Sequence, residues 1–140
     1  MLFDTDVIIW TLRGNERAAK RIDEEKRLEI SAVSYMELFK GARDKREMLM
    51  IRRYLNDLGF RIIPINENIS HRAIIYMEEH ALKSGMDIAD ALIAATAVET
   101  TLTLCTANDK HYKVISDLQL SVFRPKSSQL RKPSASVYLE

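Results

Sequence analysis

Acidic or amide side chains accompany four apolar runs in this chain. Asp4 follows the first run and Glu37 the second, Asp90 stands at the head of the third, and Asn108 with Asp109 follows the fourth. In a parallel sheet the carboxyl ends of the strands meet at one edge, where open α/β folds place their ligands. Carboxylates gathered in one crevice repel each other, and a divalent cation between them offsets that repulsion. The pattern therefore indicates a metal site.

Hydrolysis of a phosphodiester bond is one reaction that such a site could perform. It requires an activated water, neutralised phosphoryl oxygens and help for the leaving oxygen, and one or two Mg²⁺ or Mn²⁺ ions supply all three. Mg²⁺ prefers carboxylate and water oxygens and needs few protein ligands. Other kinds of site are less consistent with the sequence, because its 3 histidines are scattered, its 1 cysteine has no thiol partner and its 4 glycines form no phosphate-binding loop.

Each acid, taken alone, also has a structural explanation. Asp4 could cap a helix, since Asp is a favoured N-cap residue. Glu37 lies three residues after Ser34 and could pair with it in a capping box. Asp87 fits the N-cap of the helix that carries Asp90, where a buried carboxylate is costly without a partner. The residues by themselves leave both explanations open for Asp4 and Glu37.

The elements that must position these side chains alternate along the chain. Apolar runs predict strands at residues 3–5, 28–33, 60–65, 101–106 and 120–123. Segments with helical spacing of apolar residues lie between them. This alternation predicts an α/β fold with a mostly parallel central sheet of four to five strands.

Length and composition favour one ordinary globular domain. The 140 residues suffice for a single core, and no apolar run approaches the roughly 18 residues of a membrane span. No secretory signal pattern is visible, and a lone cysteine suits a reducing compartment, so we expect a cytoplasmic protein without a membrane partner. We expect the domain to occupy residues 1–123 and a polar tail to occupy residues 124–140. The formal net charge of +1 announces no global field for nucleic acid, although a local basic strip can still bind phosphates.

Four segments of the sequence together resemble a known family, the PIN-domain ribonucleases, and in particular the VapC-type toxins of type II toxin–antitoxin pairs. The segments that carry the resemblance are residues 3–9, 30–38, 90–97 and 106–112. Their order and spacing cover residues 1 to about 123. The resemblance implies a three-layer PIN-like fold with helices on both faces of the sheet.

The resemblance also implies which residues form the site. Its three acids fall on Asp4, Glu37 and Asp90, which would hold Mg²⁺ or Mn²⁺ and act in catalysis. The fourth position falls on Asn108, two residues after a threonine, while Asp109 is the other candidate. Residues that would support the site are Thr5, Asp6, Asp87, Thr106 and Asp109.

The implied function is a divalent-metal-dependent endoribonuclease toxin that cleaves RNA with a metal-activated water. Transfer RNA is one substrate of such toxins, a VapB-like antitoxin is the implied partner and a homodimer the implied assembly. Basic side chains directly after Glu37 could hold the RNA backbone or could form a solvated helix face. These side chains are Lys40, Arg43, Lys45 and Arg46.

Two other functions compete with this one. A receiver-like signalling domain also carries an acidic pair on a parallel sheet, but it needs a phosphoacceptor Asp after its central strand. Residues 60–65 lead to Asn66 instead. A PIN-like scaffold that binds RNA without cutting would not need Asp4, Glu37 and Asp90 together.

Overall fold

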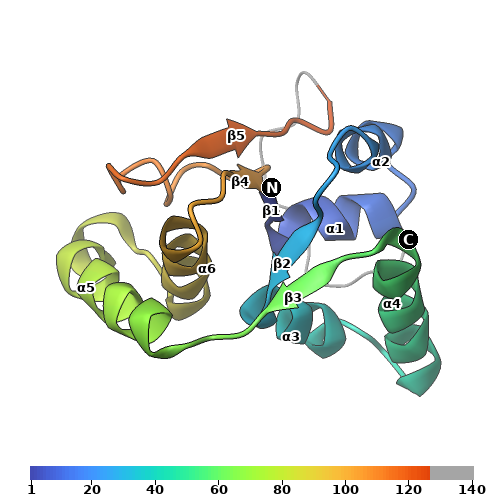
Figure 1. Cartoon of the computed structure of the whole chain (residues 1–140), viewed down its shortest axis with the longest axis horizontal. Coiled ribbons are helices and arrows are strands. Elements are labelled where there is room, and N and C mark those ends of the chain that lie inside the picture. The colour runs from blue at the N-terminus through green and yellow to red at the C-terminus, as the bar shows by residue number, and fades with distance from the viewer. Residues whose placement is uncertain (127–140) are drawn as a thin grey trace.

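A computed structural model describes residues 1–126 of the chain and contains a five-stranded sheet (Figure 1). Its strands are β1 (Leu2–Phe3), β2 (Glu29–Ser31), β3 (Arg61–Ile63), β4 (Leu104–Thr106) and β5 (Leu120–Val122). Its helices are α1 (Thr5–Leu12), α2 (Glu16–Asp23), α3 (Ala32–Lys40), α4 (Lys45–Leu58), α5 (Glu67–Ser84) and α6 (Ile88–Glu99). The strand order is β3-β2-β1-β4-β5 and every pair is parallel. The predicted α/β class is confirmed.

The sheet separates two hydrophobic cores, as a three-layer fold requires. Leu2 packs into one core with residues of α5 and α6, while its neighbour Phe3 packs into the other with residues of α1, α2 and α4. Adjacent side chains of a strand point to opposite faces, so this two-residue strand contributes to both cores. Figure 1 shows α5 and α6 on one side of the sheet and α1 and α4 on the other.

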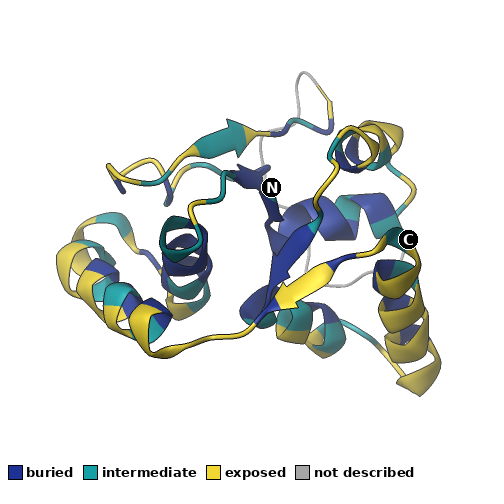
Figure 2. Ribbon diagram, viewed as in Figure 1, coloured by how far each residue is buried: buried dark blue, intermediate teal, exposed yellow. Residues whose placement is uncertain are grey.

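Burial falls from the centre of the sheet to its edges (Figure 2). Strands β1, β2 and β4 are buried along their whole length, whereas Arg61 and Ile62 of the edge strand β3 are exposed. The central strand is therefore β1, which ends at Asp4. The receiver-like alternative had placed residues 60–65 at the centre, and the structure puts that segment at the edge.

Polar side chains begin most of the helices where the sequence predicts. Asn15 and Asp87 accept N–H groups as N-caps of α2 and α6. Gly59 and Gly85 follow α4 and α5 with φ values of 83° and 70°, the left-handed conformation that favours glycine after a helix.

The predicted start of α3 is wrong. Ser31, not Ser34, is the N-cap, because β2 ends three residues earlier than expected and the Ser31 side chain accepts the N–H of Val33. Ser34 lies inside the helix, so Glu37 is too far from the helix start to complete a capping box. The side chain of Glu37 is consequently available for contacts across the site.

The described chain extends a short way past the predicted domain end. Phe123 is buried, and Arg124 is anchored to the loop after β4. Most of the predicted tail, residues 127–140, lies outside the described residues. Within residues 1–126, none of the helices has the length and apolar character needed to cross a bilayer.

Candidate active site

The two central strands bring Asp4 and Thr106 together. Strands β1 and β4 pair in parallel, so the residues that follow Phe3 and end β4 meet at one edge of the sheet. The Thr106 hydroxyl donates to Asp4 Oδ2 at 2.8 Å, and the backbone N–H of Thr5 donates to Asp4 Oδ1 at 2.8 Å. Asp4 is 0% exposed. Its carboxylate is thus held in place through both oxygens.

Asp6 lies one step further along the same edge. The backbone N–H of Ala107 donates to Asp6 Oδ2 at 3.2 Å, and the N–H of Asn108 donates to Thr106 Oγ1 at 3.1 Å. The Thr106 hydroxyl also lies 3.4 Å from Asp6 Oδ2, but it has one proton and its contact with Asp4 is shorter. The loop after β4 is thereby tied to the first turn of α1.

Helix α3 contributes Glu37 to this group. The hydroxyl of Thr5 donates to Glu37 Oε1 at 2.6 Å, a short bond of the kind that a carboxylate acceptor makes. Thr5 therefore uses its backbone for Asp4 and its side chain for Glu37. One threonine orients two of the predicted acids.

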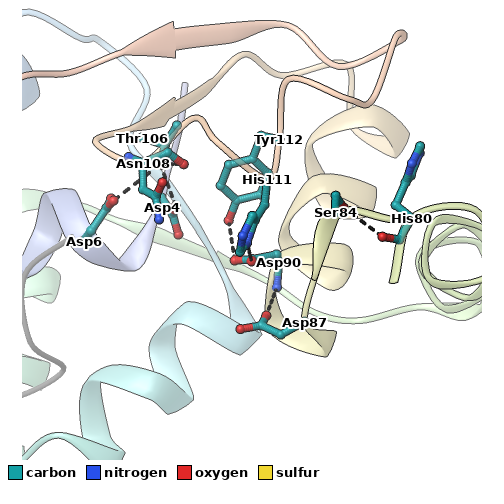
Figure 3. Close-up of polar contacts among 10 residues, drawn as sticks. All are labelled: Asp4, Asp6, His80, Ser84, Asp87, Asp90, Thr106, Asn108, His111 and Tyr112. Atoms are coloured by element: carbon teal, nitrogen blue, oxygen red, sulfur yellow. Dashed lines mark hydrogen bonds and ion pairs between the residues drawn. The ribbon is translucent and has the colours of Figure 1, made fainter. Parts of the chain in front are cut away.

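Asp90 reaches the site from the first turn of α6 (Figure 3). Its backbone N–H donates to the capping carboxylate of Asp87 at 2.8 Å. Its own carboxylate lies 3.0 Å from His111 Nδ1 at Oδ2 and accepts the Tyr112 hydroxyl at Oδ1 at 3.2 Å. Asp90 is 6% exposed. Asp87 thus supports the backbone, and the turn after β4 supports the carboxylate.

Tyr112 lies between the Asp4 and Asp90 groups. Burial raises the pKa of its phenol well above the usual value, and the negative charges of Asp4, Asp90 and Asp6, with a hydrogen bond to Asp4, raise this pKa further. The phenol consequently stays protonated and keeps its proton for donation to carboxylates. We assigned Tyr112 no such part from the sequence, although an aromatic residue with a polar tip beside a predicted acid was visible there.

The two candidates for the fourth position point to different partners. Arg124 donates from Nη2 to Asp109 Oδ1 at 3.3 Å and from Nη1 to the carbonyl of Ala107 at 2.8 Å. The Asp109 carboxylate is thus turned to Arg124, while the backbone of Asn108 is bonded to Thr106. Figure 3 shows Asn108 with Thr106 and Asp4. Arg124, an anchor of this loop, was placed in the tail by the sequence.

The predicted RNA-binding residues occupy another part of the surface. Lys40 ends α3, and Lys45 and Arg46 are exposed in the first turn of α4. Arg43 is engaged with Glu47, whose carboxylate accepts its backbone N–H at 2.8 Å and lies 3.4 Å from its Nε. The structure places this segment at the connection between α3 and α4, at the lower right of Figure 1.

The donor set can be tested against the implied metal. Within residues 1–126, no three His, Cys, Asp or Glu side chains converge in an arrangement that could hold an ion. Mg²⁺, however, usually binds through one or two carboxylates and keeps several waters, which substrate phosphates can replace. Asp4 and Asp90 offer oxygen ligands of that kind, so the donor chemistry fits Mg²⁺ or Mn²⁺.

Comparison with known proteins identifies the family. The PIN domain matches residues 1–117 of this chain. The chain belongs to the PIN domain family. Ribonuclease VapC10 of Mycobacterium tuberculosis is 33% identical over 125 residues, which cover 85% of this chain and 90% of that protein.

Solved structures show the same PIN fold. A toxin–antitoxin complex from Klebsiella pneumoniae is similar with a TM-score of 0.72 and 28% identity, covering 89% of this chain and 97% of that one. FitAcB from Neisseria gonorrhoeae is similar with a TM-score of 0.69 and 27% identity, covering 89% and 96%. The predicted resemblance to PIN-domain proteins of the VapC type is confirmed, and the receiver-like alternative is excluded.

Proposed function

We propose that this PIN-domain protein is a divalent-metal-dependent endoribonuclease and the toxin of a toxin–antitoxin pair. One observation carries the proposal. The carboxylates of Asp4, Glu37 and Asp90, which come from three separate elements, are each held by a hydroxyl group of the chain. Its similarity to a protein named Ribonuclease VapC10 supports RNA as the substrate.

In this proposal, Asp4 and Asp90 hold the ion and Glu37 completes the acidic group. A bound Mg²⁺ or Mn²⁺ activates water and neutralises charge on the phosphate. Thr106 keeps the Asp4 carboxylate oriented, and Tyr112 does the same for Asp90, so that neither carboxylate must reorganise when substrate arrives. Asn108 is the fourth residue, because the Asp109 carboxylate is engaged by Arg124.

The partners follow from the similar structures. The Klebsiella structure is a toxin–antitoxin complex, which supports a VapB-like antitoxin as the partner that keeps this chain inactive. A homodimer is the assembly that we propose, with tRNA among the candidate substrates. Lys40, Arg43, Lys45 and Arg46 stay a prediction for RNA contact.

A cleavage assay tests the function. The purified protein is incubated with end-labelled single-stranded RNA and with total tRNA, in Mg²⁺, in Mn²⁺ and in EDTA, beside the Asp4→Asn variant. We expect cleavage by the wild type in either ion and none in EDTA or with the variant. Cleavage that survives EDTA would overturn the proposal, and RNA binding without cleavage in any ion would favour the non-cleaving scaffold.

A further inference from the structure

A basic pocket lies between α2 and β5, apart from the acidic group. Its volume is about 380 Å³. It is lined by Arg17, Lys20, Arg21, Glu24, Val122, Phe123 and Arg124. Four of these side chains carry a positive charge and one a negative charge. We propose that this pocket binds backbone phosphates of the RNA next to the site of cleavage, an inference that rests on the proposed ribonuclease function.

Two of the four cations retain their full charge for a ligand. Arg21 is paired with Glu25 at 2.9 Å and Arg124 with Asp109 at 3.3 Å. Arg17 and Lys20 are exposed on α2, and neither forms an ion pair with any of residues 1–126. The pocket therefore presents positive charge that the described part of the chain does not neutralise.

Arg124 connects the pocket to the acidic group. Its guanidinium lines the pocket and also donates to the carbonyl of Ala107, whose N–H donates to Asp6. A second contact fixes the pocket wall, because Arg21 Nη2 donates to the Ser121 hydroxyl of β5 at 3.2 Å. A strand of RNA with a phosphate at the acidic edge can thus continue past Arg124 to Arg17 and Lys20.

The chemistry of the pocket suits phosphates. Guanidinium groups pair bidentately with phosphate oxygens, and three of the four cations are arginines. The one aromatic side chain, Phe123, is buried, so the pocket offers charge rather than a stacking surface for bases. We therefore expect the pocket to hold RNA without regard to base sequence.

The pocket also differs from the basic segment that the sequence predicted. That segment surrounds the α3–α4 connection, whereas α2 and the end of β5 lie at the opposite, upper part of the molecule in Figure 1. Arg43 of that segment is engaged with the buried Glu47. Continuity with the acidic group through Arg124 makes the α2–β5 pocket the better candidate.

The test compares two pairs of charge-removing substitutions. Arg17→Gln with Lys20→Gln empties the pocket of its two unpaired cations, and Arg52→Gln with Arg53→Gln removes the same charge from the exposed face of α4. Affinity for a fluorescent single-stranded RNA is measured by anisotropy at several salt concentrations, with Asp90→Asn present throughout to prevent cleavage. Circular dichroism melts check that all variants remain folded.

We expect the pocket pair to weaken RNA binding about tenfold at low salt. Each lost phosphate contact lowers the slope of log affinity against log salt by about 0.7 for single strands, so two contacts lower it by about 1.4. In the background that cleaves, the same pair should raise KM and leave kcat nearly unchanged, since the contact binds substrate and transition state alike. The α4 pair should change neither slope nor KM by as much.

Two results would overturn the inference and leave the proposed function standing. One is a wild type that cleaves RNA while the pocket pair and the α4 pair show equal slopes. The other is a pocket that binds oligoglutamate as tightly as RNA and loses that binding in the pocket pair, which would assign it to an acidic protein segment. Failure of the proposed function is distinct, because the wild type would then cleave no RNA in either ion.

Discussion

The two sides of the acidic group are built differently. The Asp4 side lies at the ends of the central strands, and its carboxylate is bonded to Thr5 and Thr106, which belong to α1 and β4. The Asp90 side lies at the start of a helix, and both partners of its carboxylate come from the turn after β4. The sheet therefore fixes Asp4, whereas a loop fixes Asp90. Tyr112 is the residue whose phenol is influenced by both.

The largest expected effect comes from removing either charge. Asp4→Asn and Asp90→Asn should each slow RNA cleavage by about a thousandfold, because the charge stabilisation that a bound ion supplies is worth about 4 kcal/mol. The two substitutions together should cost little more than one, since both disable the same ion. Single-turnover rates at saturating Mg²⁺ provide the measurement. A double variant slowed by the product of the two single effects would mean that the sides act independently.

The side chains that hold the two acids should have smaller and unequal effects. Thr106→Val and Tyr112→Phe should reduce kcat/KM by about tenfold to a hundredfold, the usual range for groups that orient metal ligands. Thr106→Val should cost more, because Asp4 Oδ2 then loses its hydroxyl donor, whereas Asp90 keeps His111. Mg²⁺ titrations of both variants check the order. The reverse order would show that the loop, rather than the sheet, limits the geometry of the site.

Residues of the loop itself should separate by their contacts. Asn108→Ala should slow cleavage about tenfold, at the low end for residues that support a metal site. Asp109→Ala should have a weaker effect on the rate, because the Asp109 carboxylate faces Arg124. Rates measured at one Mg²⁺ concentration suffice. A larger effect of Asp109→Ala would show that this carboxylate turns toward the ion when substrate binds.

The sheet side was also the more predictable from sequence. Asp4 follows a buried strand, and the parallel pairing that alternating elements imply is enough to place it near Thr106. The pairing of Asp90 with His111 and Tyr112 depends on the path of an irregular turn, which no periodic pattern specifies. Charge runs misled for a related reason. The densest basic run folds around α3 and α4, while the pocket at α2 and β5 gathers cations more than 100 residues apart, such as Arg17 and Arg124.

The smallest expected effect concerns stability at high pH. Burial raises the pKa of the Cys105 thiol from 9.0 to about 12, with the charges of Asp6 and Asp4 contributing in the same direction and Arg21 opposing them. The thiol ionises in the unfolded chain at lower pH than in the folded chain, so the unfolded state loses protons first and stability falls as the pH rises from about 9.

The Cys105→Ala variant should lack this loss. The wild type should lose about 1 kcal/mol more unfolding free energy than the variant between about pH 9 and pH 10. Urea unfolding at the two pH values measures the difference. Tyr112 begins to contribute only above its own unfolded pKa of about 10, which keeps the two sides of the site distinguishable. Parallel losses in both proteins would mean that Cys105 ionises freely in the folded chain.

Direct binding of Mn²⁺, followed by isothermal titration calorimetry, tests most directly whether the two sides form one metal site. The wild type should show saturable binding that Asp4→Asn and Asp90→Asn each weaken to a similar degree, and the double variant should bind no more weakly than the weaker single variant. Mn²⁺ binding to Asp90→Asn with the affinity of the wild type would contradict this, because the ion would then be held by the Asp4 side alone.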